Sequence, residues 1–416
     1  MPDIGSDAAV RVKPCRRGGR GDLLAHEREV EPVITRTIAI GDAGFTFIKF
    51  DLPRPALRAR LADALAECDR AAGLGNVLRQ TFFVAEGVNP AEIAGVVERG
   101  YGRPAPVTSY VRQNPADGHA LSCEIWAFTS PYPVHRGARA SWVCTPAATW
   151  GFVGGAARGG RAGPSGEDVR RMLDGAQRGL RLAGLDFAHM VRTWYYIGGL
   201  LGPAAQGSRY DEFNAARNAF YKDKWPDLLR TPASTGIGMA PGEVVFDGLV
   251  VKPESDNLEI SWLDNPLQTP PYLYDIRAEQ VRKPSFSRGA AVKLGDAQMT
   301  FISGTASIRQ SRVLHADDVA AQTETTIENI SALLGGASLD DLQLLRVYVK
   351  RPRDVEIVRD CCRGQLPDAP CAYLIADVCR PDCLVEIEGV HFAASVPAEA
   401  LSGAGAPSAQ GRQEPL

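Results

Sequence analysis

Apolar residues recur at helical spacing in two parts of the chain, residues 167–183 and 316–334. One face of each stretch is apolar, through Val169, Met172, Leu173, Ala176 and Leu180 in the first and Val319, Thr323, Ile327, Ile330 and Leu334 in the second. In both places two strands precede this helix, and a strand, a second helix and a final pair of strands follow it. The pattern predicts a β-β-α-β-α-β-β unit that occurs twice.

A short sequence repeat marks the start of each unit. The tripeptide Arg-Gly-Ala stands at Arg136–Ala138 in the first and at Arg288–Ala290 in the second. Helices that return between strands cover one face of a sheet, so the other face must be buried as well. We therefore expect an α+β fold in which an N-terminal domain, residues 31–256, and a C-terminal domain, residues 257–396, share a barrel-like core. The N-terminal domain would carry an extra β-rich segment before its unit.

The composition is that of a globular protein. Of the 416 residues, 45% are apolar and 23% are charged, and the net charge of −3 favours neither nucleic acid nor an anionic membrane as a partner. No apolar run approaches the roughly 18–20 residues that span a bilayer, and the basic N-terminus lacks the apolar stretch of a secretory signal. We expect a cytoplasmic protein with reduced thiols. Residues 1–30 and 397–416 have little apolar periodicity and are predicted to be disordered tails.

No sequence motif indicates a metal or a cofactor. Cys379 and Cys383 are four residues apart and could form half of a metal site, but no second pair and no histidine complete four ligands. The glycine runs at residues 151–155 and 198–202 match neither of the common phosphate-binding patterns. The expected site therefore contains neither group.

The C-terminal unit resembles the RidA/YjgF family in the segments Phe301–Thr305, Val347–Lys350 and Leu384–Val390. A chain with two such units and an additional N-terminal β segment is similar to the chorismatases, over most of residues 31–395. RidA proteins, with their chorismate-mutase-like fold, are trimers with a site for carboxylate ligands at each subunit interface. The resemblance implies a pseudo-trimeric core within one chain, which would be a monomer or a homo-oligomer. It also implies an enzyme that cleaves the enolpyruvyl ether of chorismate and releases pyruvate.

Glu386 is the candidate catalytic acid. Chorismate is a dianion with a vinyl ether, so its cleavage requires a proton on the methylene carbon and then an anion beside the oxocarbenium ion; a glutamate with a raised pKa can supply both. Glu386 and Glu388 share one face of a strand, whereas the first unit has Val245 and Asp247 at the matching positions. A carboxyl present in one unit alone favours catalysis, and the resemblance gives Glu386 the same role. Glu388 is expected to accept hydrogen bonds from backbone N–H groups.

The resemblance also implies substrate-binding residues in both units. Arg136, Tyr195 and Arg359 match positions that bind the substrate in the family, so the site should lie between the units. The alternatives are surface or helix-face arginines and a tyrosine packed in the core. Arg346, on a predicted strand, is a further candidate.

Two pairs of residues complete the predicted site. Ser303 and Gly304 lie at a strand corner whose N–H groups and hydroxyl could bind a carboxylate, although a β-bulge without a ligand is equally compatible. Cys379, seven residues before Glu386, and Gly289 resemble the pair that distinguishes the branch making 3-hydroxybenzoate; the alternative for Cys379 is packing alone.

The resemblance leaves three other functions open. A chorismate hydrolase would give a dihydroxycyclohexadiene carboxylate and pyruvate, and a RidA-like ligand-binding or interaction protein would show no turnover. Imine deamination is disfavoured, because RidA imine hydrolases carry an arginine 15 residues before the first glutamate and this chain has Cys371 there.

Overall fold

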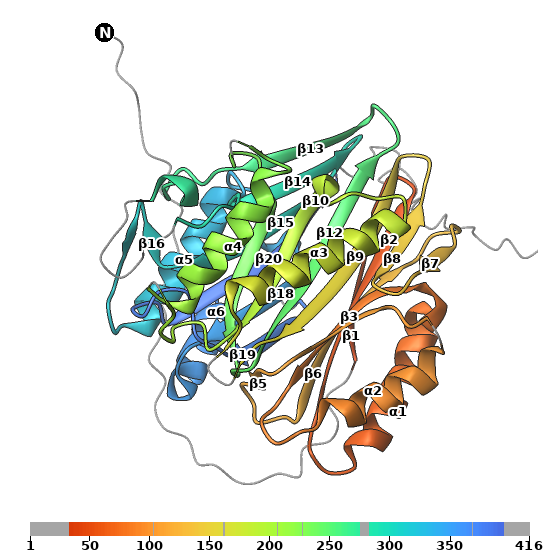
Figure 1. Ribbon diagram of the computed structural model, residues 1–416, viewed down its shortest axis with the longest axis horizontal. Helices are drawn as coiled ribbons and strands as arrows, with labels where there is room; N and C mark the ends of the chain where they lie inside the picture. Colours follow the sequence, from red (N-terminus) through yellow and green to blue (C-terminus); the bar gives the residue numbers. More distant parts are fainter. Residues whose placement is uncertain are drawn as a thin grey trace, which may run out of the picture.

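The computed structural model describes residues 33–394, except for residues 103, 161–162, 206, 227, 275–282 and 368. The predicted tails, residues 1–30 and 397–416, lie outside the described residues. Three sheets meet in the middle of the molecule and their helices lie on the outside. In Figure 1, α1 and α2 are at the lower right, α3 and α4 cross the front, and α5 and α6 are at the left.

The two predicted copies of the β-β-α-β-α-β-β unit are present, and we call them unit 2 and unit 3. Unit 2 consists of β7 (Val134–Arg136), β8 (Ala140–Cys144), β9 (Ala148–Arg158), α3 (Gly166–Leu182), β10 (Met190–Gly198), α4 (Arg209–Lys222), β11 (Ala233–Met239) and β12 (Glu243–Pro253). Unit 3 consists of β13 (Leu258–Leu263), β14 (Gly289–Leu294), β15 (Ala297–Ala306), the short hairpin β16 (Ile308–Arg309) and β17 (Arg312–Val313), α5 (Val319–Leu333), β18 (Leu342–Val349), α6 (Val355–Arg363), β19 (Cys371–Ile375) and β20 (Val385–Ala394).

The N-terminal segment is a further copy of the unit and not the β-rich extension that the sequence pattern predicts. This unit 1 consists of β1 (Ile34–Ile40), β2 (Ala43–Leu52), α1 (Leu57–Ala72), β3 (Val77–Val84), α2 (Pro90–Tyr101), β4 (Val107–Val111) and β6 (Leu121–Phe128). The short strand β5 (Asn114–Pro115) leaves unit 1 and pairs with β19 of unit 3. Unit 1 lacks the Arg-Gly-Ala tripeptide of the other two copies, so the sequence repeat does not reveal unit 1.

Five strands of each sheet follow the same order, and β7 adds to the edge of the unit 2 sheet while β13 and β5 add to the two edges of the unit 3 sheet. The last strand of each unit lies between its second and third strands, which gives the orders β1-β2-β6-β3-β4, β8-β9-β12-β10-β11 and β14-β15-β20-β18-β19. The final strand of each order, β4, β11 or β19, runs parallel to its neighbour. The predicted α+β fold with a repeated unit is therefore confirmed.

Each sheet buries both faces, which accounts for strands such as β2 and β6 whose residues are buried throughout. One face of each sheet packs on its own two helices and forms a separate apolar cluster. The opposite faces of all three sheets share a single central cluster, which contains Trp126 of unit 1, Trp194 of unit 2 and Phe301 of unit 3. The shared cluster holds the units in a closed ring.

The edge strand of one unit lies against the next unit around this ring. Strand β4 contacts β9 and β12, β11 contacts β15, and β19 pairs with β5. The ring thus contains three comparable junctions, between units 1 and 2, units 2 and 3, and units 3 and 1. Any functional site built from such a junction has two related positions elsewhere in the chain.

Candidate active site

Strand β20 places Glu386 and Glu388 on the face that points to the centre of the ring. Glu386 pairs with Tyr348 of β18, just as Val245 pairs with Tyr196 in unit 2 and Ser122 pairs with Phe83 in unit 1. The described residues therefore have a carboxyl at this position in one of the three units. The sequence comparison shows that unit 2 lacks this carboxyl, and the structure shows that unit 1 lacks it as well.

Glu386 lies at the junction of units 2 and 3. It is 4% exposed, and a Cβ atom at Gly304 of β15 would overlap its Oε1 atom. The same Cβ atom would lie 3.3 Å from Cγ2 of Thr235, which belongs to β11 of unit 2. The absence of a side chain at Gly304 thus leaves the space that the carboxyl occupies.

The surroundings of Glu386 favour its neutral form. Burial, and after it the nearby Glu388 carboxylate, together raise the pKa of Glu386 to about 8 against the opposing effects of Arg192 and Arg288. Among the described residues, no group donates a hydrogen bond to its carboxyl. At neutral pH the group is therefore a carboxylic acid whose proton is available to a ligand.

Cys379 lies beside Glu386, in the loop that leads to β20. Its side chain packs against both the central cluster and the helix-side cluster of unit 2, where it meets Tyr210 of α4. Desolvation and the neighbouring Glu386 raise the pKa of the Cys379 thiol to about 12. A neutral thiol is a weak nucleophile, so this residue can shape the site but does not attack a substrate.

Two arginines of unit 3 supply positive charge near the acid. Arg288, immediately before β14, is 3% exposed; one terminal nitrogen donates to Thr269 O at 2.8 Å and to the hydroxyl of Tyr274. Its Nε atom has no partner among the described residues. The Arg380 guanidinium lies 4.7 Å from the centre of the same Tyr274 ring. These cations could bind the carboxylates of an anionic ligand.

Helix α4 provides the opposite wall. Tyr210 is buried against Gly236 of β11, close enough to Cys379 for the two side chains to interact. Farther along the same face, Arg217 donates to Asn214 at 2.8 Å, and the Arg217 Nε and Asn214 Nδ2 atoms have no partner in the described part of the chain. None of these residues is predicted from the sequence as part of the site. The Arg-Gly-Ala repeat aligns Arg288 with Arg136, but in the structure its counterpart in unit 2 is Arg139: the Ser303 N–H donates to Arg288 O at 3.0 Å, as the Gly154 N–H donates to Arg139 O at 3.0 Å.

Three of the expected substrate-binding residues lie elsewhere. Arg136 donates to the carbonyls of Leu74, Gly75 and Val77 at 2.6–3.1 Å and so joins unit 2 to unit 1. Tyr195 is fully buried under α4, where its hydroxyl is 2.8 Å from that of Tyr221.

Arg359 on α6 pairs with Asp117 of unit 1, at the junction of units 3 and 1. Arg136, Glu386 and Arg359 therefore belong to three different junctions. Sequence spacing within a repeat cannot specify which neighbouring unit a residue faces, and this explains why the three residues lie apart.

Gly289, Ser303 and Gly304 also differ from their expected roles. Gly289 faces Leu333 of α5, on the side of the sheet away from Glu386. Ser303 Oγ donates to Ser287 O at 2.6 Å and accepts from the Ser234 N–H at 2.8 Å, and the Gly304 N–H donates to Thr235 Oγ1 at 3.0 Å. The strand corner is thus occupied in joining β15 to β11 and does not offer these groups to a carboxylate.

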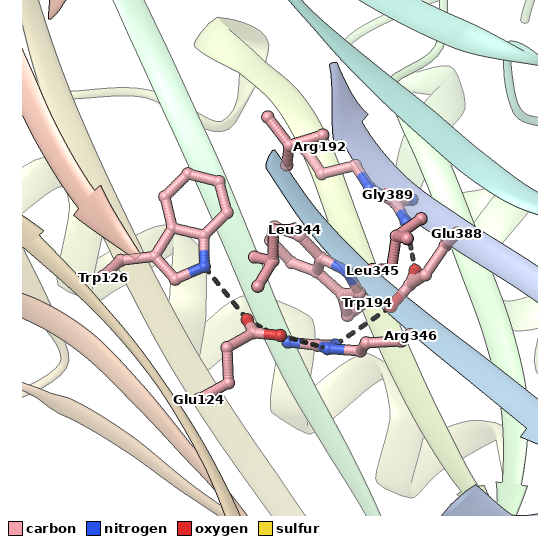
Figure 2. Close-up of a pocket in the computed structure, with 10 residues that line it drawn as sticks. Glu124, Trp126, Arg192, Trp194, Leu344, Leu345, Arg346, Glu388 and Gly389 are labelled. Atoms are coloured by element: carbon pink, nitrogen blue, oxygen red, sulfur yellow. Dashed lines mark hydrogen bonds and ion pairs between the residues drawn. The ribbon is translucent and has the colours of Figure 1, made fainter. Parts of the chain in front are cut away.

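A buried ion network lies on the ring axis beside the acid (Figure 2). Glu388 accepts from Arg192, Arg346, Tyr348 and Thr235, so side chains bind it and not the expected backbone N–H groups. Arg346 continues the network to Glu124, with donor–acceptor distances of 2.6 and 2.7 Å. The reserve candidate Arg346 is therefore a structural residue. The enclosed cavity is about 10 Å³, which is room for about one water molecule.

The network extends to the third carboxylate, Asp247 of unit 2. Arg79 donates to Asp247 at 2.7 Å and to Glu124 at 3.1 Å. Three guanidinium groups, one from the third strand of each unit, thus neutralise three carboxylates from the last strands. The three carboxylates occupy equivalent positions in their strands, although Arg346 lies two residues beyond the position that Arg79 and Arg192 occupy. Glu386, in contrast, has no carboxylate counterpart in units 1 and 2.

Comparisons with known proteins agree with the fold. Residues 124–250 match the family model described as chorismatase FkbO/Hyg5-like, N-terminal. The chain is 33% identical over 221 residues to a 3-hydroxybenzoate synthase of Streptomyces hygroscopicus, a match that covers 49% of this chain and 64% of the relative. It is 28% identical over 318 residues to a chorismatase of the same organism, covering 72% of this chain and 89% of the relative.

A solved chorismatase structure matches the fold with a TM-score of 0.64 and 24% identity, covering 85% of this chain and 100% of that chain. A chorismatase of Streptomyces rapamycinicus is 33% identical over 221 residues, a match that covers 50% of this chain and 65% of the relative. The chain thus covers just under two thirds of the two relatives that are 33% identical to it. Within the described residues, no helix has the length and apolar character that crossing a membrane requires.

Proposed function

We propose that this chain is a chorismatase that cleaves chorismate to pyruvate and 3-hydroxybenzoate; the match of residues 124–250 to the FkbO/Hyg5-like N-terminal family model and the shared fold support this. The observation that carries the proposal is the buried carboxyl of Glu386, which burial keeps protonated and which occurs at one of three equivalent positions. The names of the similar proteins, 3-hydroxybenzoate synthase and chorismatase, support the substrate class. The reaction assigns this chain to the chorismate-cleaving lyases.

Glu386 would act first as an acid and then as an anion. It transfers its proton to the methylene carbon of the enolpyruvyl group, which leaves an oxocarbenium ion beside the new carboxylate. The paired charges stabilise each other because the site is buried. Intramolecular attack within the ring substituents then releases pyruvate, and loss of a ring proton gives the aromatic product. No net water is consumed.

The substrate's two carboxylates need cations or oriented donors. Arg288 and Arg380 are the arginines closest to this role, because both lie on the Tyr274 side of the site and Arg288 has a free Nε–H group. Both differ from the residues that the resemblance implies. Cys379 and Tyr210 would fill the space beside the ring and exclude the water that the hydrolase branch adds. Gly289 faces Leu333 of α5, so its position does not support a direct role in selecting between the two product branches.

The experiment that tests the function is incubation of the pure chain with chorismate. Pyruvate would be measured with lactate dehydrogenase, and the aromatic product would be identified by chromatography against 3-hydroxybenzoate, 4-hydroxybenzoate and the dihydroxycyclohexadiene carboxylate. We expect equal amounts of pyruvate and 3-hydroxybenzoate. Pyruvate with the diene diol would assign the chain to the hydrolase branch, and no consumption of chorismate would contradict the enzymatic function.

The activity should decrease at alkaline pH. The acid form of Glu386 is the reactive one and its pKa is about 8, so kcat/KM should be constant below that pH and decrease about tenfold per unit above it. The carboxylates of chorismate are ionised throughout this range, so the decrease reports on the protein. The measurement is kcat/KM between pH 6 and 9.5 at constant ionic strength. A rate that rises with pH would mean that the ionised form is active.

A further inference from the structure

Two buried arginines at the junction of units 2 and 3 have no carboxylate partner. Five arginines of the described residues are at most 3% exposed, and they are Arg79, Arg192, Arg217, Arg288 and Arg346. Three of them pair with carboxylates of the ion network on the ring axis. Arg217 of α4 and Arg288 before β14 form no ion pair with any described residue. A guanidinium keeps its charge when it is buried, so each of these two positions holds an uncompensated cation.

One hydrogen bond and three aromatic rings surround Arg217. A terminal nitrogen of Arg217 donates to Asn214 Oδ1 at 2.8 Å. The guanidinium carbon lies 5.1–5.8 Å from the ring centres of Tyr195, Phe213 and Tyr221. The Arg217 Nε and Asn214 Nδ2 atoms are buried and have no hydrogen-bond partner among the described residues. Unsatisfied buried donors are costly, and an anionic ligand would satisfy both of them.

The same stretch of α4 contacts the segment that leads to Arg288. Asn218, the residue after Arg217, donates from its side-chain amide to Lys283 O at 2.9 Å. Lys283 belongs to unit 3 and stands five residues before Arg288. The two unpaired arginines thus come from different units and approach one junction, Arg217 from the α4 wall and Arg288 from the wall that unit 3 forms.

Tyr210 relates Arg217 to the acid. Burial raises the pKa of Tyr210, two turns before Arg217 on α4; Arg217 opposes this rise and Glu386 adds to it, so both groups lie near the Tyr210 hydroxyl. Arg288 acts on Glu386 itself, because it opposes the rise in the Glu386 pKa, and Arg217 is not among the groups that shift that pKa. Arg288 is therefore the cation nearer the acid, and Arg217 is the more distant one.

We propose that Arg217 and Asn214 bind the ring carboxylate of chorismate, while Arg288 binds the carboxylate of the enolpyruvyl group. This assignment rests on the proposed function. The methylene carbon that Glu386 protonates belongs to the enolpyruvyl group, so the carboxylate of that group meets the arginine nearer the acid. The ring carboxylate then points to the α4 wall, where it supplies the anion that Arg217 lacks. Two cations on opposite walls fix the orientation of the ring relative to the acid.

Binding of the two products separates the two arginines. 3-Hydroxybenzoate carries the ring carboxylate and pyruvate carries the other, and calorimetric titration measures both affinities without turnover. Arg217→Met should weaken binding of 3-hydroxybenzoate by about tenfold or more, the usual effect of losing a hydrogen bond to a charged group, and should leave pyruvate within about twofold. Arg288→Met should show the opposite selectivity. Lys222→Met is the matched control, because it removes an exposed cation from the same helix; both affinities should stay within about twofold of the unmodified chain.

The selectivity of the loss distinguishes a ligand contact from a structural role. Unchanged binding of 3-hydroxybenzoate by Arg217→Met, or an equal loss of both products, would overturn the proposal. Consumption of chorismate is measured separately. Binding of 3-hydroxybenzoate that depends on Arg217 in a chain that does not consume chorismate would support the carboxylate subsite and contradict the proposed function. Normal consumption of chorismate with unchanged 3-hydroxybenzoate binding in Arg217→Met would contradict the subsite alone.

A crystallographic measurement on the unmodified chain decides the question if Arg217→Met does not fold. Crystals soaked in 3-bromobenzoate should show an anomalous bromine peak at the junction of units 2 and 3, with the carboxylate within hydrogen-bond distance of Arg217 Nε. A carboxylate bound to Arg288 and not to Arg217, or no peak at this junction, would overturn the proposal.

Discussion

Replacement of Glu386 by glutamine should lower kcat for chorismate by about 10²- to 10⁴-fold, the usual contribution of a general acid. Glutamine has the same shape but no acidic proton, and the carboxyl it replaces receives no hydrogen bond from the described residues, so the geometry of the site should persist. Chorismate should still bind, because the cations Arg288 and Arg380 are unchanged. The measurement is steady-state release of pyruvate, with binding of chorismate followed separately.

Two controls distinguish a lost proton from a damaged fold. Glu243→Gln removes a carboxyl of the same size from a partly exposed ion pair with Arg112, and its activity should stay within about twofold. Glu386→Gln itself should be at least as stable as the unmodified chain at pH 9. An unfolded glutamate ionises near 4.5 and the folded Glu386 near 8, so between these values rising pH destabilises the folded chain, and glutamine removes that effect. A variant that keeps more than a tenth of the activity would exclude Glu386 as the acid.

The sequence predicts the repeated unit because its helices carry long apolar faces. The expected helices at residues 167–183 and 316–334 correspond to α3 and α5 in the structure. The resemblance to the chorismatases is likewise confirmed over residues 124–250 by the family model, and the solved structure confirms the fold. Apolar patterns of this kind can be recognised in the sequence because each depends on one helix or strand and the sheet on which it packs.

Unit 1 shows the limit of that approach. Its helix α1 has a buried apolar face that includes Leu61, Leu65 and Cys68, but the unit has no Arg-Gly-Ala tripeptide. If unit 1 is not recognised, the sequence predicts a single junction, between units 2 and 3. With unit 1, the chain has three junctions, and residues assigned to one site are distributed over all of them.

The placement of Arg136 and Arg359 follows from this. Each occupies a junction, as expected, but each faces unit 1 and not the acid. Glu386 and Cys379 lie together because seven residues of one chain segment connect them, whereas Arg288, Tyr210 and Thr235 come from distant segments that only the fold brings together. Contacts between units depend on tertiary structure, so a single sequence does not encode them in any local pattern.

The ion network on the ring axis explains how the candidate active site can hold the neutral acid Glu386 next to Glu388. Arg192 and Arg346 both pair with Glu388, and the charge of Glu388 helps to raise the pKa of Glu386 two residues away. The two carboxyls of one strand face therefore differ in their partners: Glu388 accepts from two arginines, and Glu386 accepts from none of the described residues. Their environments differ although their sequence context is nearly the same.

Replacement of Arg346 by methionine should destabilise the folded chain by about 3–5 kcal/mol, the cost of removing one partner from a buried ion network. Arg346 is 3% exposed and donates to Glu124, Glu388 and the Tyr196 hydroxyl, so its loss leaves two buried carboxylates short of a partner. Methionine fills a similar volume, and the loss is therefore electrostatic. The free energy of unfolding would be measured by urea denaturation at pH 7.

The pH dependence of this loss identifies its cause. Burial alone would raise the pKa of Glu124, but Arg346 and Arg79 outweigh it and hold the pKa below its ordinary value of 4.5. The contribution of this carboxylate is thus present above pH 4.5 and disappears as the pH falls through its folded value, so the difference between the unmodified chain and Arg346→Met should shrink in acid. Arg353→Met, at an exposed position, should change stability by no more than about 0.5 kcal/mol. A loss below about 1 kcal/mol for Arg346→Met would mean that apolar packing, and not the ion network, holds the three units together.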